Sequence, residues 1–188
     1  MNAASQFDVL KFRQGDKQAF KLVYDCLFKN ICLFVYKYVH NQEVAEDIAQ
    51  ETFVTLWGHK LEMDSWVHIK SFLYLISRNA SLDYLKHEKI KGQYCDFVLA
   101  NYEDSETFMN FVIEEEVERI LLQTEADLSP RCKEIFILSM QEKSNEEIAM
   151  QLKISVNTVK TQKKIAYKIL KHHISELSVL IVWLSENI

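Results

Sequence analysis

A lysine-rich segment near the carboxyl end of the chain carries the side chains best suited to binding another molecule. Residues 155–164 read SVNTVKTQKK and present hydroxyl, amide and ammonium groups at helical spacing. Ammonium groups contact DNA phosphates, and amide and hydroxyl groups hydrogen-bond to base edges in the major groove. The candidates for such contacts are Ser155, Asn157, Thr158, Lys160, Thr161, Gln162 and Lys164. Their chemistry is DNA recognition rather than catalysis.

The elements around this segment predict a helix-turn-helix. Ser144, with Glu147 three residues later, forms a capping box for a short helix. Lys153 and Ile154 make a tight turn, and Ser155 then caps a second, lysine-rich amphipathic helix. Residues 144–172 hold six lysines and two glutamates, a balance that suits phosphate contact. The alternative is an αα-hairpin with a basic face, since Lys153 stands where such turns often have Gly.

A second group of candidate residues lies on a predicted helix in the amino-terminal half. Asp16 is expected to cap a long amphipathic helix that ends near His40, and a second helix is expected from Gln42 to Trp57, with Gly58 as its stop. The inward stripe of the second helix is Ala45, Ile48, Ala49, Thr52, Phe53 and Leu56. Another face combines acidic, amide and large apolar side chains, namely Asp47, Gln50, Glu51, Val54 and Trp57. Such a face fits a partner-binding surface or an ordinary solvated surface.

A third helix is expected from about Val67 to His87, with a core stripe of Ile69, Phe72, Leu73, Ile76 and Ala80. Polar residues lie largely off that stripe, and the preceding loop adds an aromatic and an imidazole side chain. The set is Trp66, His68, Arg78, Asn79, Asp83 and Lys86. Aromatic and amide groups beside bases suit the stacking and edge-reading of single-stranded DNA. A core tryptophan and a solvated helix end are the alternative.

The composition favours an all-α chain of two small helical domains and offers no support for an enzyme. The 188 residues include 48% hydrophobic residues but only three Gly and one Pro, fewer than most sheet folds need in their turns. The four cysteines form no C-x-x-C pair, and no nucleophile, paired-carboxylate or metal-ligand pattern is visible. We therefore predict no catalytic residue, metal or cofactor.

The expected location is the cytoplasm, with no insertion into a membrane. The amino-terminal residues MNAASQFDVL have neither the basic flank nor the apolar core of a signal peptide. The longest apolar run, residues 179–184, is much shorter than the ~18 residues that indicate a membrane span.

The charge is unevenly distributed along the chain. The formal net charge is −5, but residues 96–127 alone carry ten acidic residues and one basic residue. We expect domains at 1–92 and 126–188, joined by an acidic linker at 93–125. The linker could be simply solvated, its acidity could keep the flanking basic surfaces off nonspecific DNA, or it could mimic nucleic acid. The apolar tail at 174–188 could cap the carboxyl-terminal domain or bind a partner.

Two motifs in this order resemble those of a bacterial RNA polymerase sigma factor of the small extracytoplasmic-function (ECF) group. The segment AEDIAQETFVTLW at 45–57 resembles the helix that binds core polymerase, and residues 69–89 resemble the helix that reads and melts the minus-ten element. Residues 128–140 with EEIAMQLKISVNTVKTQ resemble the region that binds the minus-thirty-five element. The resemblance covers about residues 15–172 and implies a factor that directs core polymerase to promoters and opens the minus-ten region.

The resemblance also implies roles for single residues. Asp47, Gln50 and Glu51 would dock on the clamp helices of the polymerase β′ subunit, and Asn79 would contact a base of the unpaired minus-ten strand. The loop at about 62–68 would hold a flipped-out base. The residues Lys160, Thr161 and Lys164 would face the minus-thirty-five DNA, although Ile165 replaces a basic residue that is frequent in the family.

The partners implied by the resemblance are core RNA polymerase, through its β′ clamp helices and β flap, promoter DNA, and an anti-sigma factor. The linker at about 91–125 would thread toward the active centre and the RNA exit path. A stand-alone helix-turn-helix regulator is the main alternative, although the amino-terminal half lacks the alternating strands of a receiver domain. An acidic adaptor or anti-sigma protein is another alternative, but it would not need the lysine-rich helix.

Overall fold

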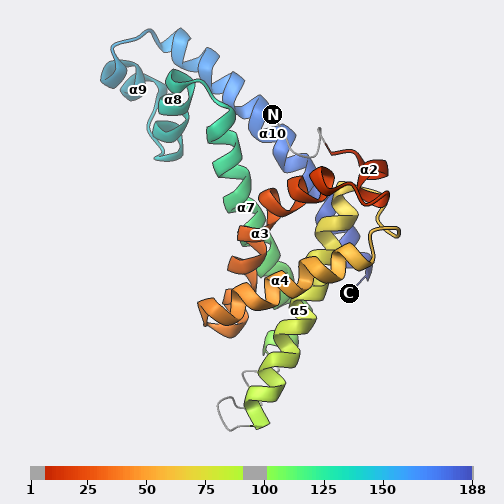
Figure 1. The fold of residues 1–188 in the computed structure, drawn as a ribbon. Coiled ribbons are helices and arrows are strands. Elements are labelled where there is room, and N and C mark those ends of the chain that lie inside the picture. Colours follow the sequence, from red (N-terminus) through yellow and green to blue (C-terminus); the bar gives the residue numbers. More distant parts are fainter. Residues whose placement is uncertain (1–6, 91–100, 188) are drawn as a thin grey trace. The chain divides into compact units, whose positions relative to one another are not determined.

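The computed structural model describes residues 7–90 and 101–187, and in these ranges the chain is helical and contains no strand. In chain order the helices are α2 (Val9–Arg13), α3 (Lys17–Val39), α4 (Gln42–Gly58), α5 (Trp66–Ile90), α7 (Ser105–Asp127), α8 (Pro130–Met140), α9 (Asn145–Leu152) and α10 (Val156–Asn187) (Figure 1). The prediction of an all-α chain is confirmed. Across the same ranges, none of the helices combines the length and apolarity needed to cross a bilayer.

The chain forms two compact units. The N-terminal unit comprises Met1–Val117 together with Ser178–Ile188, and the C-terminal unit comprises Glu118–Leu177. The helices α7 and α10 each contribute residues to both units, so neither unit boundary falls in a loop. The functional division at 1–92, 93–125 and 126–188 stays a prediction, and part of the predicted connector, 91–100, lies outside the described residues.

Two predicted signals of the N-terminal unit, the Asp16 cap and the end of α3 near His40, are confirmed, whereas α4 includes Gly58, its expected stop, and has His59 as its C-cap. The Asp16 carboxylate caps α3 by accepting a hydrogen bond from the Ala19 N–H at 2.7 Å. His40 ends α3 in the left-handed region at φ 50°, and the Asn41 side chain caps α4 by accepting from the Glu43 N–H at 3.0 Å. The two helices are therefore separated by only two residues, which favours their packing as antiparallel neighbours.

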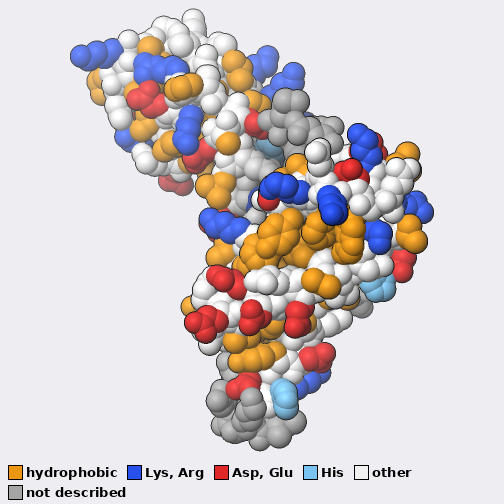
Figure 2. Space-filling view, in the orientation of Figure 1, with side chains coloured by type: hydrophobic (Ala, Val, Ile, Leu, Met, Phe, Trp, Pro, Cys, Tyr) orange, Lys and Arg blue, Asp and Glu red, His pale blue; other side chains and the backbone are white. Residues whose placement is uncertain are grey.

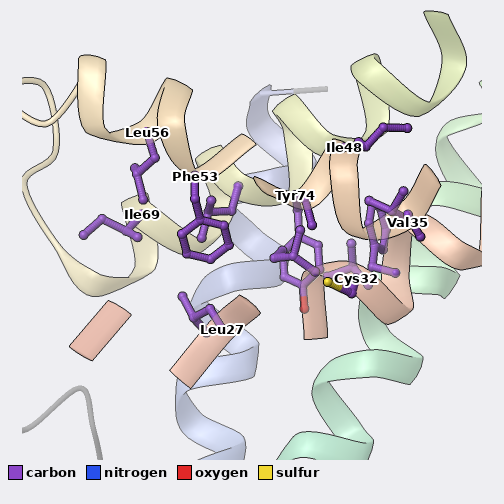
Figure 3. Packing of buried hydrophobic residues seen from close by; sticks show 14 of the residues in the cluster. Leu27, Cys32, Val35, Ile48, Phe53, Leu56, Ile69 and Tyr74 are labelled. Carbon is purple, nitrogen blue, oxygen red and sulfur yellow. The ribbon is translucent and has the colours of Figure 1, made fainter. Parts of the chain in front are cut away.

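The core of the N-terminal unit forms where α3, α4 and α5 pack together. In Figure 3, Leu27 of α3, Phe53 of α4 and Ile69 of α5 point toward one another, and all three are buried. The six residues of the predicted inward stripe of α4 are buried as well, which confirms the periodicity. Because α4 turns this whole stripe inward, its opposite face is left at the surface.

Two further segments, which no local sequence pattern places in this core, complete it. Phe108 and Val112, in the first part of α7, have no exposed surface. Leu180 and Leu184, near the end of α10, are also fully buried in the same cluster. From Ser178 onward, the apolar tail therefore packs in the N-terminal unit rather than capping the carboxyl-terminal domain.

The C-terminal unit contains the predicted helix-turn-helix. A small cluster of Ile135, Leu138, Ile148, Ala149 and Val159 holds α8, α9 and the start of α10 together. The capping box is present: the Glu147 N–H donates to the Ser144 hydroxyl at 3.2 Å, and the Ser144 N–H donates to the Glu147 carboxylate at 2.8 Å. Lys153 ends α9 at φ 52°, so the turn uses the positive φ that a lysine adopts with some strain.

Removing the capping hydroxyl should weaken the C-terminal unit. We expect Ser144→Ala to lower the free energy of unfolding by about 1 kcal/mol, because an amide at the start of α9 loses its acceptor. Urea unfolding followed by circular dichroism measures this. The control is Ser175→Ala, an exposed hydroxyl inside α10, where alanine suits the helix and little change is expected. Equal losses in both variants would contradict a specific capping role.

Candidate nucleic-acid interface

The start of α10 presents most of the predicted DNA-contacting side chains to solvent. Ser155, Asn157, Thr158, Lys160, Thr161 and Lys164 are exposed, and Gln162 is half-buried. The Ser155 hydroxyl accepts from the Thr158 N–H at 3.0 Å, so it acts as the cap of this helix. The Thr161 hydroxyl donates to the Asn157 carbonyl at 2.9 Å, which leaves its oxygen free to accept from a second donor.

A pocket of about 320 Å³ beside these residues was not foreseen. It is lined by Asn145, Lys160, Lys163, Lys164 and Tyr167. Within the described part of the chain, none of its three lysines forms an ion pair with a carboxylate. The Tyr167 hydroxyl lies 3.0 Å from that of Ser139 on α8, and the Lys163 ammonium lies 5.9 Å from the centre of the Tyr167 ring. Three unpaired ammonium groups at one edge of the helix-turn-helix suit an anionic partner such as a DNA backbone.

The outward face of α4 joins an acidic row to an apolar groove. Asp47, Gln50 and Glu51 are exposed, and Val54 has 72% of its surface exposed. Figure 2 shows a hydrophobic patch on the N-terminal unit with a row of acidic side chains beside it. An exposed valine next to a carboxylate row is better suited to a protein partner than to water or DNA.

The groove beside this row has a volume of about 440 Å³ and is lined by Lys17, Phe20, Val54 and Trp57. Trp57 stands edge-to-face on Phe20, with the ring centres 4.9 Å apart, and the Lys60 ammonium lies 4.9 Å from the centre of the Trp57 ring. These contacts hold the indole in place, so the groove is formed before any partner binds.

The beginning of α5 differs from the expected loop. Trp66 is the first residue of the helix and is only 8% exposed, because its ring packs on Phe7 at 5.2 Å. His68 is half-buried between Asp64, whose Oδ1 lies 3.1 Å from its Nδ1, and Trp183, whose ring centre is 5.5 Å away. Hydrogen bonds from Ser65, and to a smaller extent the nearby His68, lower the pKa of Asp64.

The later part of α5 divides the remaining candidates into two groups. Asn79 and Asp83 are exposed. Arg78 instead donates to the Glu103 carbonyl and lies over the Phe108 ring, 5.0 Å from its centre. Lys86 pairs with the Glu103 carboxylate at 2.9 Å, and this hydrogen bond raises the pKa of Lys86. Residue 103 thus contacts two of the predicted minus-ten residues.

Comparison with known proteins matches each half of the chain to a conserved region of one protein family. The family model "Sigma-70 region 2" matches residues 24–90, and the family model "Sigma-70, region 4" matches residues 118–170. The first match includes α4 and α5, and the second includes the helix-turn-helix. Because a sigma region occupies the amino-terminal half, a stand-alone helix-turn-helix regulator is not favoured.

Two curated proteins are similar along most of their lengths. The ECF RNA polymerase sigma factor SigW of Bacillus subtilis (strain 168) is 26% identical over 165 residues, which cover 82% of this chain and 88% of that protein. The RNA polymerase sigma factor CarQ of Myxococcus xanthus is 26% identical over 173 residues, covering 90% of this chain and 97% of that protein. The chain belongs to the ECF-type sigma factors, and it is a transcription initiation factor that directs RNA polymerase to promoters.

Proposed function

We propose that three separate surfaces of this sigma factor divide the work of initiation. The outward face of α4 docks on the clamp helices of the polymerase β′ subunit, the exposed residues of α5 contact the minus-ten strand, and the start of α10 binds the minus-thirty-five duplex. The observation that carries the proposal is the α4 face, where an acidic row adjoins a preformed apolar groove.

The α4 face has the two components of a stable protein interface. The groove offers Phe20, Val54 and Trp57 to an apolar side chain of the partner, and burying such anchors supplies most of the binding energy. Asp47 and Glu51 beside it offer carboxylates to basic groups, which sets orientation and association rate. An anti-sigma factor would inhibit this chain by covering the same groove.

The other two surfaces are weak on their own and act when polymerase fixes their spacing. Asn79 of α5 offers an amide to the edge of an unpaired base, and His68 lies near the start of the same helix. Lys160, Thr161 and Lys164 lie on one side of α10, where a recognition helix contacts a major groove. Joining two weak sites through one partner raises their combined affinity without new contacts.

The proposed functional division is 1–92 for polymerase and minus-ten binding, 93–125 as the linker, and 126–188 for minus-thirty-five binding and contact with the β flap, although residues 178–188 pack in the N-terminal unit. In this scheme the chain contributes recognition and strand capture, and bond formation belongs to the polymerase. It needs no metal ion, cofactor or catalytic residue of its own.

Co-elution with bacterial core polymerase tests the α4 surface. We expect the wild-type chain to form a complex on a sizing column and the Asp47→Ala/Gln50→Ala/Glu51→Ala variant to bind about tenfold more weakly, because the partner's basic groups lose their acceptors. The matched control is Glu106→Ala/Glu118→Ala, which also removes two exposed carboxylates but from α7. Polymerase binding that is the same in both variants would exclude the acidic row from the interface.

A further inference from the structure

The acidic segment, here residues 103–116, contacts four basic side chains of its own N-terminal unit. Lys86 pairs with the Glu103 carboxylate at 2.9 Å, and Arg78 donates to the Glu103 carbonyl. Lys37 of α3 pairs with Glu114 at 2.6 Å and with Glu115 at 3.1 Å; burial would lower the pKa of Lys37, but the hydrogen bonds and charges of the two carboxylates together raise it. Lys70 of α5 pairs with Glu116.

These contacts are anchored by a buried polar seam between α5 and α7. Lys70 and Glu116 are 2% and 0% exposed, and the Tyr74 hydroxyl also donates to Glu116, at 2.9 Å. Phe108 and Val112 are buried beside this seam. The seam holds the first part of α7 against α5 and thereby positions Glu103 near Arg78 and Lys86.

We propose that the acidic segment masks the minus-ten surface of the free chain and must leave α5 before Arg78 and Lys86 can contact DNA. This proposal rests on the proposed contact of α5 with the minus-ten strand, extended to the two residues Arg78 and Lys86 that the sequence predicts for it. The carbonyl and carboxylate oxygens of Glu103 accept from Arg78 and Lys86 as phosphate oxygens would. DNA and the acidic segment therefore compete for the same two donor side chains.

The seam between α5 and α7 is built on a buried ion pair, which suits a contact that can form and break. A buried ion pair gives a helix a defined register but adds little net stability over apolar packing, because both charges lose their hydration. Among the described residues, the Arg78 Nε is buried without an acceptor in the masked state, so the guanidinium is only partly satisfied there. A phosphate that accepts two parallel hydrogen bonds would satisfy it better.

The mask can be loosened at its exposed end without disturbing the seam. Glu103→Gln removes the charge that pairs with Lys86, and Glu106→Gln removes an exposed charge from the same helical region as a matched control. The probe is a short, fluorescently labelled random-sequence pool of single-stranded DNA, bound by the full chain. We expect Glu103→Gln to bind at least about threefold tighter than Glu106→Gln, with a salt slope steeper by about 0.7 for the added phosphate contact.

The mask can also be tightened. In the Lys70→Met/Tyr74→Phe/Glu116→Leu variant, apolar side chains replace the buried pair and the hydroxyl that serves it, which keeps or strengthens the docking of α7. We expect this variant to be as stable as the wild type or more stable, and to bind the DNA pool more weakly. Wild-type DNA affinity in a chain of raised stability would overturn the proposal, because docking would then not control the surface.

One more variant separates failure of the mask from failure of the proposed minus-ten site. If Lys86→Ala abolishes the gain produced by Glu103→Gln, the mask is supported. If Lys86→Ala weakens wild-type binding and Glu103→Gln gives no gain, Lys86 contacts DNA but is not masked, and the proposal is overturned alone. If neither Lys86→Ala nor Glu103→Gln changes DNA binding, Lys86 lies outside the DNA surface. Both the mask and the minus-ten role of Lys86 are then excluded.

Discussion

Replacing Glu116 with alanine is expected to lower the free energy of unfolding of the N-terminal unit by about 3–5 kcal/mol, because it leaves the buried Lys70 ammonium without its paired carboxylate. The Tyr74 hydroxyl would lose its acceptor in the same step. Neither group can recover the loss from water, since both residues are almost completely buried in the wild-type chain.

A matched control lies two residues away on the same helix. Glu114 also pairs with a lysine, but its side chain is 65% exposed, so Glu114→Ala should change stability by only about 0–1 kcal/mol. Urea unfolding gives the free energies, and hydrogen exchange of the α5 and α7 amides assigns the loss to this seam. A loss after Glu116→Ala no greater than that after Glu114→Ala would contradict the burial of the pair.

The helix boundaries could be predicted because their signals are local. Asp16 and Ser144 each accept a hydrogen bond from an amide three residues ahead, so a few adjacent residues determine where the helix begins. The inward stripe of α4 was predictable for a similar reason, since a period of 3.6 residues is visible within one helix. The outward face followed as the complement of that stripe.

The role of the first part of α7 could not be predicted in the same way. The three consecutive glutamates at 114–116 read as a solvated face, yet Glu115 and Glu116 are buried. Their burial depends on Lys37 and Lys70, which lie far away in sequence, and no local pattern links such distant charges. One signal was available: Lys70 follows the apolar Ile69 in a mostly apolar helical stretch, where an unpaired ammonium would be costly.

The candidate DNA residues also divide into those whose placement follows from local periodicity and those whose placement depends on distant residues. Exposure of the Lys160 and Asn79 side chains followed from helical periodicity alone. The burial of Trp66 depends on Phe7, just before the short helix α2, which the sequence analysis did not assign. The contacts of Arg78 depend on Glu103, which is 25 residues away in sequence. The pocket residues Lys163 and Tyr167 were missed because no motif sets them apart from a basic helix.

Removing two ammonium groups from the start of α10 should cost about a hundredfold in affinity for the minus-thirty-five duplex. The Lys160→Ala/Lys164→Ala variant loses two charge-assisted contacts, and each is worth about 1.5 kcal/mol. The measurement is binding of the holoenzyme to a duplex selected by the wild-type holoenzyme, titrated between about 50 and 200 mM salt. The slope of log affinity against log salt should become shallower by about 1.8, or about 0.9 for each lost phosphate contact.

A variant on the same helix separates local contact from the loss of total charge. Lys168→Ala/Lys171→Ala also removes two exposed lysines from α10, but these lie one to three turns farther from the capped start of the helix, where a recognition helix enters the groove. Long-range attraction would weaken equally in both variants, because their net charges are identical. Equal losses would therefore show that the charge of α10 acts only at a distance. A much larger loss for Lys160 and Lys164, with polymerase binding unchanged in both, would locate phosphate contacts at the start of the helix.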